Sequence, residues 1–218
     1  MNEIVDRVLD LLYPKKCVFC HKLTDNGSWV CSGCSTITVI PKEEQYQDLM
    51  YADGCYSAFY YENLVRESLH RYKFSHLSAY SGIYSQFISK CIGENGLSCD
   101  IITWVPISSK RKRSRGYDQS ELIARELADM YGFTPQKLLK KIVNNKAQSR
   151  IGSPENRKNN VQGVYKLNTS ADLTGKTIII IDDIVTTGST LSECCRVLKE
   201  KGDCEIICLT VARSRIVK

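Results

Sequence analysis

The chain has 218 residues, enough to bury a sizeable hydrophobic core in one or two domains. No apolar run approaches the roughly 18 to 20 residues that span a bilayer, and acidic residues interrupt the first apolar stretch. We therefore expect a cytoplasmic protein without a signal peptide or membrane insertion. The formal net charge of +6 favours anionic partners without selecting one of them.

Two cysteine pairs follow a short helical pattern at the N-terminus. Apolar residues recur at helical spacing over residues 3–12, and Pro14 ends the pattern. Each CxxC pair can present two thiolates to one ion, and together the pairs complete the four-sulfur shell of a structural zinc site. The predicted zinc ligands are Cys17, Cys20, Cys31 and Cys34.

Other uses of these cysteines fit the sequence less well. Residues 17–21 also have the CxxCH form of a c-type haem attachment site, but a haem would leave the second pair unexplained. A dithiol redox pair would be expected beside a thioredoxin-like βαβ unit, which the pattern does not indicate. We place a domain boundary in the polar segment 41–48, which separates a zinc domain (1–45) from a second domain (46–218).

The second domain opens with alternating strand and helix patterns. Residues 52–61 predict an edge strand or one arm of a β-hairpin, and helices are expected around residues 64–72 and 80–91. A buried strand is expected over residues 101–105, with Pro106 closing it. This alternation predicts an α/β fold built on a parallel sheet.

A strongly basic segment, residues 108–117, comes directly after that strand. Its cations are Lys110, Arg111, Lys112, Arg113 and Arg115. We expect a loop at the carboxyl end of the strand, where it can meet pyrophosphate, a nucleotide or a nucleic acid. A solvated loop without a ligand is the alternative interpretation.

The next segments lead towards the C-terminal part of the chain. Asp118 or Ser120 can cap a helix that runs to about residue 130, and the apolar residues within 138–143 predict one more short helix. Residues 144–160 are almost wholly polar, which is typical of a functional lid or of a disordered segment. A strand is expected over residues 161–167.

The most informative stretch covers residues 178–190. Four consecutive isoleucines, Ile178–Ile181, predict a strand buried on both faces, and Asp182 and Asp183 are expected where it ends. The turn that follows is Thr186, Thr187, Gly188, Ser189 and Thr190. Because it opens a helical pattern, its N–H groups and hydroxyls form an anion site of phosphate size. A phosphorylated ribose would use both parts, whereas a simple helix cap after two acids is the alternative.

This stretch resembles the 5-phosphoribosyl-1-pyrophosphate (PRPP) signature of type I phosphoribosyltransferases in its strand, its acid pair and its loop. The resemblance implies that Asp182 and Asp183 accept hydrogen bonds from the ribose hydroxyls, and that residues 186–190 hold the 5-phosphate. It also implies Mg²⁺ bound together with PRPP, release of pyrophosphate when a base-like acceptor attacks, and a mobile loop at about residues 144–160 that closes over PRPP.

The order of features along the whole chain is similar to that of the ComF family of competence-associated phosphoribosyltransferase-like proteins. The shared features are the cysteine pairs, a strand ending in Val-Pro, the basic segment, and residues 115–119, which read Arg-Gly-Tyr-Asp-Gln where the family usually has Arg-Gly-Phe-Asn-Gln. A further family pattern is matched by Gln148, Ile151, Arg157 and Asn160.

This similarity implies a part in DNA uptake and natural transformation, beside other proteins of the competence machinery. As an enzyme, the protein would use Asp182, Asp183 and Arg115 in catalysis and Lys110 as a further PRPP contact. The alternative is a non-catalytic factor that binds single-stranded DNA and uses PRPP as a structural or regulatory ligand. Its candidate nucleic-acid contacts are Lys110, Arg111, Lys112, Arg113 and Tyr117.

Overall fold

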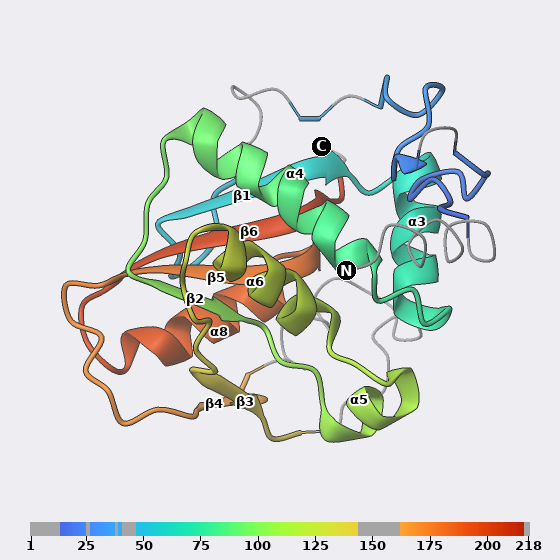
Figure 1. The fold of residues 1–218 in the computed structure, drawn as a ribbon. Helices are drawn as coiled ribbons and strands as arrows, with labels where there is room; N and C mark the ends of the chain where they lie inside the picture. The colour runs from blue at the N-terminus through green and yellow to red at the C-terminus, as the bar shows by residue number, and fades with distance from the viewer. Residues whose placement is uncertain (1–13, 25–26, 38, 41–46, 144–161, 216–218) are drawn as a thin grey trace.

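A four-stranded parallel sheet forms the centre of the computed structural model, which describes residues 14–24, 27–37, 39–40, 47–143 and 162–215 (Figure 1). The strands, in their order across the sheet, are β1 (Gly54–Tyr60), β6 (Glu205–Arg213), β5 (Thr177–Val185) and β2 (Ile101–Trp104). All three neighbouring pairs run parallel, which confirms the predicted α/β class. Residues 54–60 form the edge strand and not a hairpin arm.

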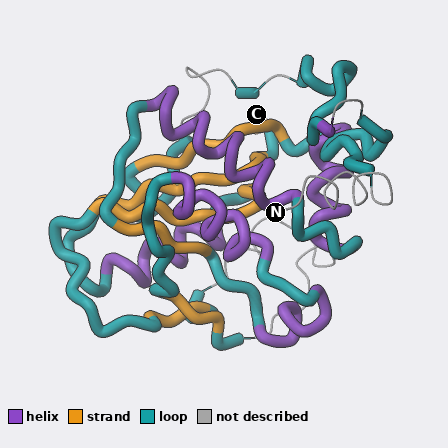
Figure 2. The backbone as a smooth tube through the Cα atoms, viewed as in Figure 1, coloured by secondary structure: helices purple, strands orange, loops and turns teal. Residues whose placement is uncertain are grey.

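The isoleucines of β5 alternate between two hydrophobic layers. Ile179 and Ile181 pack on one side of the sheet with α4 (Tyr80–Asn95) and α6 (Gln119–Met130). The intervening Ile178 and Ile180 pack on the other side with α8 (Ser189–Lys199). Figure 2 shows the strands crossing the molecule between these helices. Because both faces are covered, a strand without a polar face is stable here.

Strand β5 extends beyond the end of its neighbour β2. The β2 ladder stops at the pair Trp104 and Ile181, whereas pairing with β6 continues to Val185. Asp182 and Asp183 therefore lie within the strand, and not just after it as we predicted. Their backbone is held on the β6 side, while the end of β2 leaves the other side open.

The cysteine segment packs against the same hydrophobic layer as α4 and α6. The ring of Phe19 lies 5.4 Å from that of Phe59 on β1 and 5.9 Å from that of Phe87 on α4. Helix α3 (Asn63–Phe74) joins this layer through Leu69 and Tyr72. None of the helices in the described ranges is long and apolar enough to cross a membrane.

The basic segment, predicted to be a loop, contains the short helix α5 (Ser109–Arg115). Ser108 caps it by accepting a hydrogen bond from the Arg111 N–H, and Gly116 ends it with a φ of 82°. A hydroxyl at the start and a left-handed glycine at the end are sufficient signals for one or two helical turns. The absence of apolar periodicity concealed this helix, because no α5 side chain is buried.

The helix predicted over residues 138–143 is wrong. Residues Leu139–Lys141 form β3, which pairs antiparallel with β4 (Tyr165–Leu167) in a separate two-stranded ribbon. Six residues provide fewer than two helical turns, whereas pairing buries Leu139 and Tyr165 against the α8 side of the sheet. The predicted N-terminal helix (3–12), the predicted lid (144–160) and most of the predicted domain connector lie outside the described residues.

Asp118 joins the end of β2 to the start of α6. One of its carboxylate oxygens accepts from the Ile107 N–H at 2.9 Å, and the other caps α6 by accepting from the Glu121 N–H at 3.3 Å. The side chain is almost fully buried, and this burial raises its pKa from 3.8 to about 6 despite the two hydrogen bonds. Folding therefore favours the protonated form of this group.

We predict that Asp118→Asn changes the pH dependence of stability. The folded state binds this proton more tightly than the unfolded chain, so the wild type loses stability as pH rises from about 4 to about 6. Relative to the variant, this loss is on the order of 3 kcal/mol. Chemical denaturation at several pH values measures it, with Asp129→Asn on the exposed end of α6 as the charge-removal control. Parallel curves for Asp118→Asn and wild type would contradict the assignment.

Candidate functional site

The two carboxylates of β5 lie in a polar cavity of about 150 Å³ at the carboxyl edge of the sheet. Asp182 accepts hydrogen bonds from the Ser120 hydroxyl and from the Asp183 N–H, both at 2.9 Å. Asp183 forms an ion pair with Lys73 of α3, with Nζ and Oδ1 2.9 Å apart. Donors from three different elements thus meet the acid pair before any ligand is bound.

Cationic side chains outnumber the carboxylates in this cavity. Four of them line it: Lys73, Arg111, Arg115 and Lys141. Burial lowers the pKa of Arg115 and of Lys141, which means that an anion entering the cavity would relieve an unfavourable desolvation of positive charge. The cavity is therefore suited to a ligand that offers hydroxyl donors to the acids and phosphoryl oxygens to the cations.

The two adjacent carboxylates of the acid pair disfavour each other's ionised form. Burial and the neighbouring Asp183 carboxylate raise the pKa of Asp182 to about 7. Two adjacent carboxylates disfavour one another's ionisation, and the hydrogen bond from Ser120 and the charge of Lys73 only partly compensate. Hydroxyl groups of a bound sugar would supply the donors that favour the ionised pair.

The loop after β5 forms a second, smaller hollow that adjoins the cavity. Its volume is about 30 Å³, and Asp182 and Thr190 line both spaces. Gly188 stands at the N-cap of α8 with a φ of 73°, while the hydroxyls of Thr187 and Ser189 lie 3.0 Å apart. Backbone N–H groups and hydroxyls at the start of a helix favour an anion in such a hollow.

The basic helix α5 turns only part of its charge towards the acids. Arg111 and Arg115, four residues apart on one helix face, line the cavity. Lys112 forms an ion pair with Glu121 at 2.7 Å. Lys110 and Arg113 are exposed and do not line the cavity. Of the predicted cationic contacts, the structure thus brings together only Arg111 and Arg115 with the acids.

Tyr117, a predicted nucleic-acid contact, is partly buried and packs against the hydrophobic core. Its hydroxyl donates to the Tyr72 carbonyl, and the two rings pack with centroids 5.7 Å apart.

Lys141 is a cavity residue that the sequence analysis missed, because residues 138–143 were predicted to be a helix. It reaches the cavity from β3, where its ammonium group donates to the Tyr165 hydroxyl at 3.1 Å. Apolar and basic residues come in pairs over residues 138–143, so no alternation of single residues marked Lys141 as part of a strand.

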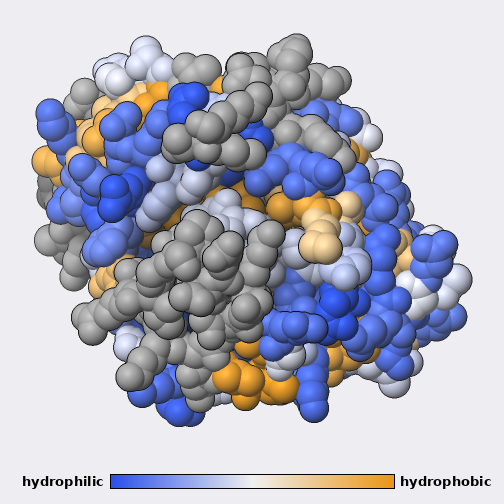
Figure 3. All heavy atoms as spheres, turned by 180° about the vertical axis from the view of Figure 1, so that it is seen from behind, coloured by the Kyte–Doolittle hydropathy of each residue, from blue (hydrophilic) through white to orange (hydrophobic). Residues whose placement is uncertain are grey.

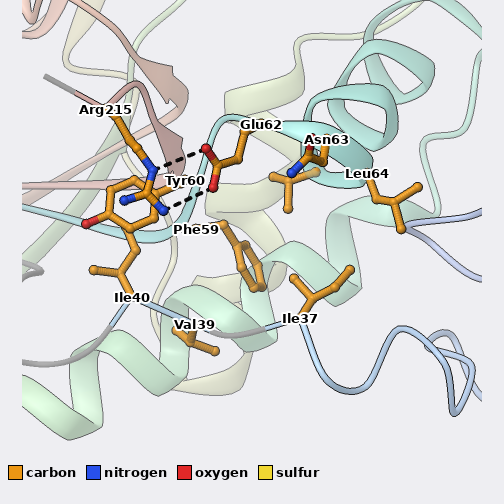
Figure 4. Close-up of a pocket in the computed structure, with 10 residues that line it drawn as sticks. Ile37, Val39, Ile40, Phe59, Tyr60, Glu62, Asn63, Leu64 and Arg215 are labelled. Atoms are coloured by element: carbon orange, nitrogen blue, oxygen red, sulfur yellow. Dashed lines mark hydrogen bonds and ion pairs between the residues drawn. The ribbon is translucent and has the colours of Figure 1, made fainter. Parts of the chain in front are cut away.

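A larger cavity, of about 560 Å³, lies beyond the ends of β1 and β6 and does not include the acids. Figure 4 shows its charged pair, Glu62 and Arg215, pointing toward one another among mainly apolar side chains. Its charges are thus already paired within the protein. On the molecular face shown in Figure 3, apolar surface forms separate patches among hydrophilic residues. The convergent polar chemistry lies in the smaller cavity.

The four cysteines of the two CxxC pairs form one cluster. All four sulfur atoms lie within 4.8 Å of one another, so the cluster can hold a metal ion. Burial would raise the pKa of the Cys17 thiol, but backbone N–H groups, chiefly that of Cys31, lower it to about 7. A lowered thiol pKa favours the thiolate, which is the form that binds metals. His21 donates or accepts a hydrogen bond with the Tyr80 hydroxyl at 2.9 Å.

We predict that Gly188→Ala destabilises the protein by roughly 1–2 kcal/mol, because a side chain disfavours the left-handed backbone. A Cβ atom would also lie 2.3 Å from Cδ2 of Leu49, which must move. Chemical denaturation measures the change. Gly93→Ala in the interior of α4 meets nothing within 4 Å and should gain about 0.5–1 kcal/mol. Unchanged stability in Gly188→Ala would show that the loop is not held as described.

Comparisons with known proteins agree with this architecture. Residues 114–216 match the family model "Phosphoribosyl transferase domain". Competence protein ComFC of Bacillus subtilis is 28% identical over 92% of this chain and 85% of its own length. DNA utilization protein YhgH of Salmonella typhi is 33% identical over 47% of this chain and 44% of its own.

Competence protein F of Haemophilus influenzae is 29% identical over 50% of this chain and 48% of its own length. A solved structure titled "Structure of the allosteric regulatory enzyme of purine biosynthesis" covers 61% of this chain and 25% of its own, with 21% identity and a TM-score of 0.38. The phosphoribosyltransferase domain match, the relative that covers nearly the whole chain and the parallel sheet together support a ComF-like protein with a type I phosphoribosyltransferase fold.

Proposed function

We propose that this protein binds PRPP and acts as a phosphoribosyltransferase-like protein in DNA uptake and natural transformation. The observation that carries the proposal is the continuous site formed by the acid pair and the loop after β5, which share Asp182 and Thr190 as lining residues. The role in DNA uptake is inferred from relatives named competence and DNA utilization proteins.

In this proposal each part of PRPP meets a matching part of the site. Asp182 and Asp183 accept hydrogen bonds from the ribose hydroxyls. These hydroxyls replace the Ser120 hydroxyl and the Lys73 ammonium group as partners of the acids. The loop, residues 186–190, surrounds the 5-phosphate. The pyrophosphate then lies among the cavity cations, which include Arg111 and Arg115 of the basic helix α5.

The proposed reaction forms a bond between an acceptor nitrogen and the anomeric carbon of the ribose, while the bond from that carbon to the pyrophosphate oxygen breaks. Positive charge develops on the ribose ring and negative charge on the leaving group. Asp182 and Asp183 hold the sugar, and Arg115 stabilises the departing pyrophosphate. Magnesium would enter as the Mg–PRPP complex and neutralise part of the pyrophosphate charge.

We predict that Asp182→Asn combined with Asp183→Asn weakens PRPP binding at least tenfold, because hydrogen bonds to charged acceptors are lost. Titration calorimetry with PRPP and Mg²⁺ measures the affinity, and circular dichroism checks that the fold is kept. Asp129→Asn, on the exposed end of α6, is the matched control and should bind as the wild type does. Equal PRPP affinity in the double variant would reject the site.

We further propose that the cysteine cluster holds a structural zinc ion. Four thiolates make a closed tetrahedral shell without an open position for a substrate, which is typical of structural zinc. The cluster lies in a segment with little apolar surface of its own, so metal binding would contribute to its stability.

Changing Cys31 to Ser is expected to lower bound zinc from about one ion per chain to near zero and to reduce the thermal midpoint. Elemental analysis of purified protein and a thermal melt give the two readouts. Cys99→Ser, at a half-buried cysteine outside the cluster, should retain its metal. Wild-type protein purified without any metal would remove the zinc proposal.

A second function is favoured by the cations that do not reach the cavity. Lys110 and Arg113 are exposed on α5, and no ion pair within the described ranges involves either of them. Exposed cations beside an anion cavity suit the phosphates of single-stranded DNA. In that function the protein is a non-catalytic DNA-binding factor working with the competence machinery, and PRPP is its structural or regulatory ligand.

A further inference from the structure

Helix α3 presents a stripe of basic and aromatic side chains to solvent. Arg66, His70 and Phe74 follow one another at intervals of four residues, so they lie on one helix face, and all three are exposed. The rings of His70 and Phe74 are 4.7 Å apart between centroids, with an angle of 43° between their planes. The stripe thus ends in two adjacent rings at the carboxyl end of the helix.

Phe74 is an unusual phenylalanine in this chain. All five phenylalanines lie within the described residues, and Phe74 is the only exposed one, at 57% of its surface. The others are buried or half-buried, and three of them, Phe19, Phe59 and Phe87, pack in edge-on or tilted contacts. A large apolar ring left in water at the edge of a polar cavity is a candidate contact for a ligand.

Two residues next to the Phe74 ring, Lys73 and Arg115, line the acid cavity. Lys73, the chain neighbour of Phe74, points into the cavity and pairs with Asp183. The guanidinium of Arg115, which also lines the cavity, stands 5.0 Å from the centre of the Phe74 ring. Arg115 thereby contacts an aromatic face and the anion cavity at the same time.

Charge around this ring favours an anionic ligand with a planar part. Arg66 lies two turns earlier on the stripe, and the exposed Lys110 and Arg113 belong to the same basic helix as Arg115. Nucleobases stack on aromatic side chains in a sequence-tolerant way, and neighbouring cations neutralise the phosphates that accompany them. A planar base with a phosphate-bearing sugar beside it satisfies both features.

We propose that Phe74, flanked by His70 and Arg115, is a stacking platform for a nucleobase at the mouth of the acid cavity. This deepens the proposed function, on which the choice of a nucleobase over other planar groups rests. The base comes either from a free acceptor, positioned near the ribose of PRPP, or from single-stranded DNA passing along the basic stripe. Both sources present the same ring face to Phe74.

The test compares a labelled oligo-dT with an abasic oligonucleotide of equal length by fluorescence anisotropy. Wild-type protein should bind oligo-dT more tightly than the abasic strand, and Phe74→Ala should weaken oligo-dT binding about tenfold without affecting the abasic strand. The dependence of affinity on salt should stay the same, because Phe74→Ala removes no charge. Met130→Ala, which alters the exposed last residue of α6, is the matched control.

Phe74→Trp provides a second readout, because a stacked base quenches indole fluorescence. Quenching by oligo-dT assigns the platform to DNA, and quenching by adenine in the presence of PRPP assigns it to the acceptor. Calorimetry with PRPP and Mg²⁺ should give the same affinity for Phe74→Ala and wild type, which separates this platform from the acid site. The proposal is overturned if neither ligand quenches the tryptophan and Phe74→Ala binds oligo-dT as tightly as wild type.

Discussion

The unequal length of two neighbouring strands is the constraint on which the site depends. Strand β5 keeps its pairing with β6 through Val185, but β2 ends opposite Ile181. Asp182 and Asp183 thus have a rigid backbone on one side and space for a ligand on the other. A site placed on a strand is held more firmly than one on a loop, which matters because misplaced carboxylates lose much of their binding energy.

In the absence of a ligand, side chains of the protein itself contact both carboxylates of the acid pair. Burial of two adjacent carboxylates is costly, and Ser120 and Lys73 supply a hydrogen bond and a charge that reduce the cost. These contacts come from α6 and α3, which also meet in the hydrophobic layer and through the Tyr72 hydroxyl, which donates to the Gln119 carbonyl at 2.9 Å. A ligand with hydroxyl groups therefore competes with protein donors, and its affinity reflects the difference between the two sets of contacts.

How much the sequence predicted depended on how local each signal was. The strand of isoleucines, the two acids and the loop are contiguous, and the structure places the acids and the loop together at the carboxyl end of this inner strand. Lys141 was not predicted as a site residue, because its strand pairs with residues more than twenty positions away and its three-residue length carries no clear period. Pairing between distant segments cannot be read from one short window.

The basic segment shows a different limit of the sequence. Its charge was evident, but only the helical geometry of α5 separates Arg111 and Arg115, which line the cavity, from Lys110 and Arg113, which do not. A loop would have offered all five cations equally. The capping signals at Ser108 and Gly116 were present in the sequence, and apolar periodicity was the wrong criterion for a helix that buries no side chain.

The cysteine segment and the acid cavity are connected through α3. The Ser68 hydroxyl and the Arg71 guanidinium donate to the carbonyl of Val18, and Arg71 also donates to that of Phe19, so the first CxxC turn holds this helix directly. The next turn of α3 carries Lys73 on Asp183, and Phe74 beside Arg115. One helix therefore bears both sets of contacts, so a single element joins the cysteine segment to the cation that pairs with Asp183.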